Sequence, residues 1–263
     1  MIEIPVFDDK FDLFDHLIEN KSLHIATKKS TLKFADAIQC SIEGEVSKAA
    51  FADVSSADKI EVESIINTTN VMDSHDDVHI NGLWDKSIRQ DKDLFLLQEH
   101  EMKFDKVISD NVKVSAPVMT WKELGYKRFQ GETQALMFKS LIEKSRNEFM
   151  FNQYAKGHVK NHSVGMRYIK IALAVNNDST EFKAEFDVYQ KHINDIVNSK
   201  EVNKQGYFWA VTEARVIEGS AVVKGSNTLT PTTSIQTKLE QSGDTPKTEQ
   251  SGDTQTTNNK LFI

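Results

Sequence analysis

The chain has 263 residues, enough for one domain with appendages or for two small domains, and 39% of them are hydrophobic and 27% charged, as is usual for a globular protein. Its 39 Asp and Glu residues outnumber its 32 Lys and Arg residues, which gives a formal charge of -7. This acidic balance argues against binding along a phosphate backbone, so we expect no nucleic-acid partner.

The first fifty residues predict helices without an obvious chemical group. Residues 1–9 lack the basic and apolar regions of a secretory signal, and no run of 18 apolar residues predicts a membrane span, so we expect a cytosolic protein. Apolar residues recur at helical spacing over 8–20, and a second helix is expected over much of 22–40. Cys40 is the only cysteine. It cannot form an internal disulfide, and we interpret it as a buried or incidental thiol.

The region from about residue 59 to residue 227 predicts strands with two helices between them. Apolar and polar residues alternate from 59 onward, as in half-buried strands, and the run at 94–97 is apolar throughout and leads to His100. The expected strands are 60–66, 94–97, 112–118, 135–142, 163–175, 208–211 and 220–223. The expected helices are 144–156, which stops at Gly157, and one capped by Asp178 or Ser179 that continues to Ile196.

The C-terminal segment predicts disorder. After Asn227 the composition changes to Thr, Ser, Gln, Asn and Lys, and a six-residue sequence beginning at Glu240 is repeated at Glu249. Such a segment has too few apolar residues to offset the entropy lost on ordering. We therefore divide the chain into a helical N-terminal extension at 1–50, a central domain at 51–227 and a disordered polar tail at 228–263.

Three residues are candidates for nucleophilic catalysis. Ser163 begins a predicted strand and is followed two residues later by Gly165, which lets another chain approach the backbone. His100 ends an apolar run, which would hold a general base rigidly. Glu218 lies between apolar residues on a late strand, where a buried carboxylate needs a partner. Each residue taken alone is more often structural than catalytic.

The densest polar cluster in the chain lies at residues 73–79. Asp73, His75 and His79 are of types that bind divalent metals, but their spacing matches no known metal motif, and turn-forming roles explain Asp and Ser there equally well. We expect no metal and no cofactor.

Taken in order, these segments resemble the prohead (head-maturation) proteases of tailed bacteriophages, which are related to herpesvirus assemblin. The resemblance spans roughly 58–227. It rests on four segments: the Asp-rich loop that begins at Asp73, the apolar run 96–100 that ends in His, the Ser-x-Gly strand at 163–165, and the Glu-x-Ser-x-Val strand at 218–222.

The resemblance implies a serine endopeptidase with Ser163 as nucleophile, His100 as general base and Glu218 as the third member of the triad. Glu213 is the other nearby acid. Backbone N–H groups near Gly165, with Arg167, are our guess for the oxyanion site. The implied fold is α+β, a mainly antiparallel β-barrel of the assemblin type with surrounding helices.

The implied setting is the host cytoplasm, inside the assembling prohead. There the enzyme would cleave scaffold and major capsid protein, with the chain itself as a further candidate substrate, and the resemblance leaves room for a homo-oligomer. Two alternatives stay open at this point. One is a catalytically inactive scaffold or capsid-assembly protein. The other is a metal-dependent hydrolase centred on the cluster at 73–79.

Overall fold

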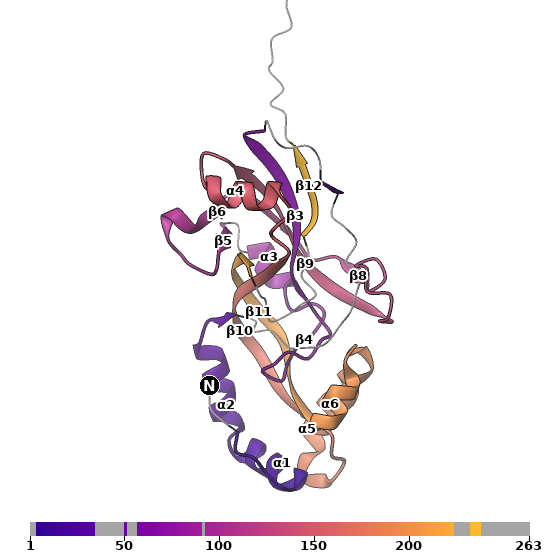
Figure 1. Ribbon diagram of the computed structural model, residues 1–263. Coiled ribbons are helices and arrows are strands. Elements are labelled where there is room, and N and C mark those ends of the chain that lie inside the picture. The colour runs from indigo at the N-terminus through magenta and orange to yellow at the C-terminus, as the bar shows by residue number, and fades with distance from the viewer. Residues whose placement is uncertain (1–3, 35–49, 52–56, 91–92, 224–231, 238–263) are drawn as a thin grey trace, which may run out of the picture.

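A computed structural model describes residues 4–34, 50–51, 57–90, 93–223 and 232–237. Within them the chain forms α-helices and strands in an α+β arrangement (Figure 1). The helices are α1 (Lys10–Glu19), α2 (Lys21–Ser30), α3 (Asp85–Gln90), α4 (Glu148–Ala155), α5 (Lys183–His192) and α6 (Ser199–Gln205). Short 3-10 turns lie at Phe104–Lys106, Thr180–Phe182 and Ile193–Asp195.

The strands form two sheets. The first has the order β1 (Lys33–Phe34), β10 (Asn161–Val175), β11 (Tyr207–Val222), β5 (Leu96–Gln98) and β6 (Val107–Ser109), with β4 (Asp77–His79) also paired to β11. The second has the order β2 (Ala50–Phe51), β12 (Thr232–Thr237), β3 (Lys59–Thr68), β9 (Glu132–Glu143) and β7 (Val112–Ser115), with β8 (Val118–Thr120) paired to β9.

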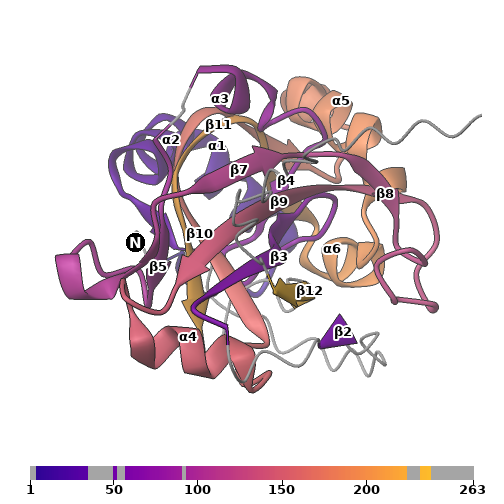
Figure 2. The ribbon, with the colours of Figure 1, turned by 90° about the horizontal axis from the view of Figure 1, so that it is seen from above.

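The main core lies between the two sheets. Alternate residues of β10, among them Val164, Met166 and Tyr168, pack with Phe138 of β9 and Ile66 of β3. Helix α4 covers one end of this core (Figure 2) and contributes Met150, Phe151 and Tyr154 to it. Because successive side chains of a strand point to opposite faces, the odd-numbered residues at the start of β10 face away from this core.

The longest strand pair of the described structure is the antiparallel pair β10 and β11. The two strands pair from Asn161 with Val222 to Val175 with Tyr207, and α5 and α6 lie in the connection between them. The two short strands expected at 208–211 and 220–223 are therefore parts of one 16-residue strand. Charged residues separate the two apolar runs of this strand, but pairing with β10 continues across them.

The N-terminal helices pack on this strand pair. Asp9 caps α1, its side chain accepting a hydrogen bond from the Phe11 backbone at 2.6 Å. Phe14 and Leu17 of α1 pack against Trp209 of β11 in a second core, at the end of the molecule opposite α4 (Figure 1). The second helix ends at Ser30, well before residue 40, because the chain then enters β1 and joins the sheet.

Two expectations about the fold were not met. The described strands form two separate sheets and no closed barrel, since β1 and β6 lie at opposite edges of the first sheet and do not pair with each other. Most of the described strand pairs are antiparallel, while β4 and β5 run parallel to β11 and β2 runs parallel to β12. Residues 232–237, expected within the disordered tail, form β12, which lies between β2 and β3 in the second sheet. The rest of the tail and Cys40 lie outside the described residues.

Candidate active site

The three candidate catalytic residues come from three neighbouring strands of the first sheet. In the ladder between β10 and β11, Ser163 pairs with Ser220 and Gly165 pairs with Glu218. Paired residues of an antiparallel ladder share a face, and so do residues two apart on one strand. Ser163, Gly165, Glu218 and Ser220 therefore lie on one face, the face turned away from the main core. His100 follows β5, which pairs with the same stretch of β11.

His100 and Glu218 are in direct contact. The Nδ1 atom of His100 lies 2.7 Å from Oε1 of Glu218, a carboxylate that is almost completely buried. With the carboxylate accepting from Nδ1–H, the neutral imidazole carries its lone pair on Nε2. This is the tautomer that a general base of the serine-protease type requires.

An unusual turn places His100 in this position. Glu99 and His100 both have positive φ angles, of 52° and 61°. This left-handed conformation costs a non-glycine residue on the order of 1 to 2 kcal/mol. The turn is held by the Glu99 backbone N–H, which donates to the carbonyl of Ala221 at 3.0 Å, and by the Glu99 side chain, which accepts from the Val223 backbone at 3.1 Å. Strain held by surrounding bonds in this way is commonest at functional sites.

Ser220 bridges His100 and Glu218 by hydrogen bonds, although the sequence analysis gave Ser220 no role. Its hydroxyl donates to Oε2 of Glu218 at 2.6 Å and accepts from the backbone N–H of His100 at 3.1 Å. The hydroxyl therefore fixes both the acid and the backbone of the base. The signal was present in the sequence, because a Ser two residues after Glu218 on a strand must share its face.

Ser163 lies beside this group but is not yet bonded to it. Directly opposed residues in a ladder have Cβ atoms about 4.5 to 5.5 Å apart, so Ser163 is adjacent to Ser220, which itself contacts both His100 and Glu218. The Ser163 hydroxyl is buried and has no hydrogen-bond partner in the described structure. Buried hydroxyls nearly always have a partner, so an exception on this face calls for an explanation.

Gly165 has a spatial role that differs from the oxyanion role expected of it. A Cβ atom built at this position would lie 2.0 Å from Oε1 of Glu218, so the missing side chain is what makes room for the carboxylate. Its backbone is paired on both sides, with Glu218 and with Phe34 of β1. An oxyanion at Gly165 would also lie against a negative charge. Arg167 is exposed two residues further along the strand. Neither residue offers an evident oxyanion site here.

Glu213, the other acid considered, is engaged elsewhere. Its carboxylate lies 2.6 Å from Lys170 and 2.8 Å from Lys86. Hydrogen bonds from Lys170 and then Lys86 lower the pKa of Glu213 to about 2. The structure therefore pairs His100 with Glu218 and leaves Glu213 in a separate group of charges.

No family model, curated protein or solved structure matches this chain. The case for a function therefore rests on the site itself.

None of the described helices is long and apolar enough to cross a membrane.

The polar cluster at 73–79 forms a buried network of its own. Asp73 accepts from the backbones of His75 and Asp77, at 2.8 and 2.9 Å, and so closes the turn. Asp77 is ion-paired with the buried Lys28 and accepts from the Tyr168 hydroxyl at 3.0 Å. Burial, followed by the charge of Asp77, raises the pKa of the Asp73 carboxyl.

His79, the second histidine of the cluster, is also hydrogen-bonded within this network. His79 contacts Asn67 at 3.1 Å through Nδ1 and Tyr168 at 3.0 Å through Nε2. Burial lowers the pKa of His79 to about 4. Among the described residues no group of three or more His, Cys, Asp or Glu side chains is arranged to hold a metal ion.

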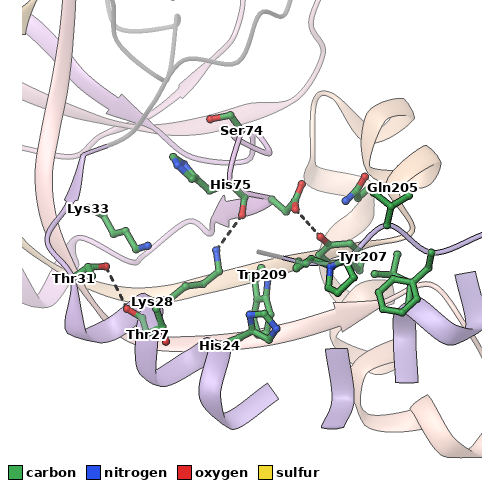
Figure 3. A pocket seen from close by; sticks show the side chains of 16 residues that line it. His24, Thr27, Lys28, Thr31, Lys33, Ser74, His75, Gln205, Tyr207 and Trp209 are labelled. Carbon is green, nitrogen blue, oxygen red and sulfur yellow. Dashed lines mark hydrogen bonds between the residues drawn. The ribbon is translucent and has the colours of Figure 1, made fainter. Parts of the chain in front are cut away.

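Figure 3 shows a cavity of about 780 Å³ beside this cluster. Lys28 points across it and donates to the carbonyl of His75 at 3.0 Å, while Tyr207 and Trp209 form part of its floor. None of the candidate catalytic residues lines this cavity. Its place is under the N-terminal helices.

Proposed function

We propose that this chain is a serine endopeptidase of viral prohead maturation, with Ser163 as nucleophile, His100 as general base and Glu218 as the acid that orients the base. One observation carries the proposal: His100 and Glu218 are in contact at 2.7 Å on the same face as the buried Ser163 hydroxyl, which has no hydrogen-bond partner among the described residues. The three residues are 55 to 118 positions apart in the chain, so that their grouping depends entirely on the fold.

The proposed chemistry is acyl transfer. Nε2 of His100 takes the proton of Ser163 as the hydroxyl oxygen bonds to the carbonyl carbon of a peptide. The protonated imidazole is stabilised by Glu218 and returns the proton to the leaving amine as the C–N bond breaks. A water molecule, deprotonated by His100, then hydrolyses the acyl-enzyme and releases the acid product.

This chemistry requires one contact that the present geometry does not contain. Ser163 must form a hydrogen bond to Nε2 of His100, and such bonds are often long or absent before substrate binds. Ser163 is only 3% exposed. Productive binding therefore requires local movement that opens this face to the substrate.

The prohead setting extends the proposal beyond the site. In this setting the enzyme acts in the host cytoplasm inside the immature capsid and cleaves scaffold and major capsid protein. An assemblin-like relationship belongs to the same proposal. It is supported by the order of the three residues along the chain and by their position on adjacent strands, and it does not depend on a closed barrel.

The direct test is covalent labelling of the nucleophile. A fluorophosphonate probe reacts with an activated serine, and peptide mass spectrometry identifies the labelled residue. We expect wild-type protein to be labelled at Ser163 and Ser163→Ala to be unlabelled. Ser140→Ala is a matched control, since Ser140 is also a buried strand serine whose hydroxyl has no partner in the described structure.

A second measurement separates the peptidase from an inactive assembly protein. Wild-type and Ser163→Ala protein are incubated with the co-encoded major capsid protein, and products are followed by mass spectrometry. Cleavage by the wild type alone supports the proposal. Absence of both labelling and cleavage in folded wild-type protein would leave the assembly role.

A further inference from the structure

We infer that the cleft between α4 and the adjoining ends of β10 and β11 receives a large apolar side chain of the polypeptide substrate, within two residues of the bond that is cut. The inference rests on the proposed function. The cleft has a volume of about 470 Å³, within the range of roughly 300 to 1,000 Å³ that is typical of ligand sites. Its lining comes from α4, from the segment that leads into β10, and from the ends of β5 and β11.

The cleft adjoins the candidate active site along the strands. Each strand that supplies a catalytic residue also supplies part of its wall. Gln98 and Glu99 directly precede His100, Asn161 lies two residues before Ser163, and Val222 lies two residues after Ser220.

The distance between the cleft and the nucleophile fits a neighbouring substrate residue. Asn161 and Val222 are paired in the ladder, as Ser163 and Ser220 are. Two residues along a strand span about 7 Å. An extended substrate has the same rise per residue, so a side chain one or two positions from the scissile bond reaches the cleft.

The chemistry of the walls selects an apolar side chain. Phe149, Met150 and Val159 line the interior, and Phe149 is 61% exposed, so its ring is accessible to a substrate side chain. The charged residues of the lining, Glu99 and Lys160, have opposite signs. Their charges offset each other, so the cleft favours neither an acidic nor a basic substrate residue.

Helix α4, which forms one side of the cleft, is held in place by hydrogen bonds at both of its ends. The side chain of Asn147 caps it by accepting from the Met150 backbone at 3.0 Å, and also donates to the carbonyl of Asp105 at 3.3 Å. At the other end, the Tyr154 hydroxyl lies 2.9 Å from Nε2 of His162, the residue before Ser163. The helix is thus bonded both to the chain segment after His100 and to the strand of the nucleophile.

The test uses a library of peptides derived from a bacterial proteome, with cleavage sites identified by mass spectrometry. Wild-type protein is expected to enrich Leu, Met or Phe at one position within two residues of the cut. In Phe149→Ala we expect kcat/KM for the best such peptide to fall about tenfold or more, the usual effect of losing pocket contacts. The labelling rate of Ser163 by fluorophosphonate should stay within about twofold of wild type.

Phe11→Ala is the matched control. Phe11 is a partly exposed phenylalanine of α1 and lies at the opposite end of the molecule from α4 (Figure 1). It should leave the cleavage profile unchanged. If Ser163 is labelled and peptides are cut without any apolar preference, or if Phe149→Ala keeps the wild-type profile, the inference is wrong while the proposed function stands. If neither labelling nor cleavage occurs, both are wrong.

Discussion

The substitution Gly165→Ala should inactivate the proposed enzyme without unfolding it. The added Cβ would lie 2.0 Å from Oε1 of Glu218, whereas ordinary contacts begin at 3.4 Å. The carboxylate would therefore have to retreat by about 1.4 Å. A shift of this size would break the hydrogen bond of 2.7 Å to Nδ1 of His100.

The size of the effect follows from the role assigned to Glu218. Loss of the acid in triads of this type lowers kcat by about 10⁴-fold, which corresponds to about 5 kcal/mol in the activation barrier. Overpacking of this kind costs about 1 to 3 kcal/mol of folding stability. We therefore expect a folded protein, as judged by circular dichroism, whose Ser163 reacts with fluorophosphonate at least a hundredfold more slowly.

A double-mutant cycle separates this mechanism from a general disturbance of the strand. In a Glu218→Ala background the carboxylate is gone and the new methyl group has room. Gly165→Ala should then change the labelling rate by no more than about twofold. A wild-type rate in the single variant would refute the reasoning, as would equal losses from Gly165→Ala in both backgrounds.

Three further outcomes follow from the same contacts. In Ser220→Ala the Glu218 carboxylate loses a hydrogen bond of 2.6 Å. We expect kcat to fall roughly 10- to 100-fold at unchanged KM, and the free energy of unfolding in denaturant to fall by about 1 to 3 kcal/mol. A kcat equal to that of the wild type would contradict the positioning role of Ser220. Gly131→Ala and Gly206→Ala both place an alanine at positive φ, which costs about 1 to 2 kcal/mol of stability each. Of these two positions, only at Gly206 would the added Cβ meet a phenylalanine ring, at 2.9 Å. Gly206→Ala should therefore be the less stable variant by at least about 1 kcal/mol in denaturant unfolding. Burial lowers the pKa of His79 to about 4, so the unfolded chain binds more protons than the folded protein between pH 6.5 and pH 4. The free energy of unfolding should therefore fall by roughly 3 kcal/mol as the pH drops through this window. A His79→Gln variant whose stability has the wild-type dependence on pH would contradict this prediction.

The sequence alone determined much of the local structure. The spacing of apolar residues predicted α1, α4 and the long strand β10, because helical and strand periodicities depend only on neighbouring residues. It also identified His100, Ser163 and Glu218 as candidates, but only through the order of short motifs, and their catalytic roles remain a proposal.

The tertiary structure decided which of these residues meet. Glu213 and Glu218 lie five positions apart on one strand, and sequence reasoning kept both as candidates for the acid. The ladder skips Ile217, pairing Gly165 with Glu218 but Met166 with Val216, and a bulge of this kind changes which face the following residues occupy. No local pattern reveals such a shift in register.

The same holds for the turn at His100 and for the shape of the sheets. Two successive non-glycine residues with positive φ are locally unfavourable, and they persist because Ser220 and Ala221, more than 100 residues away, hold their backbones. Whether sheets close into a barrel depends likewise on edge strands finding each other across the whole chain. Contacts between distant residues thus fixed the site, since local preferences are weaker than the sum of such contacts.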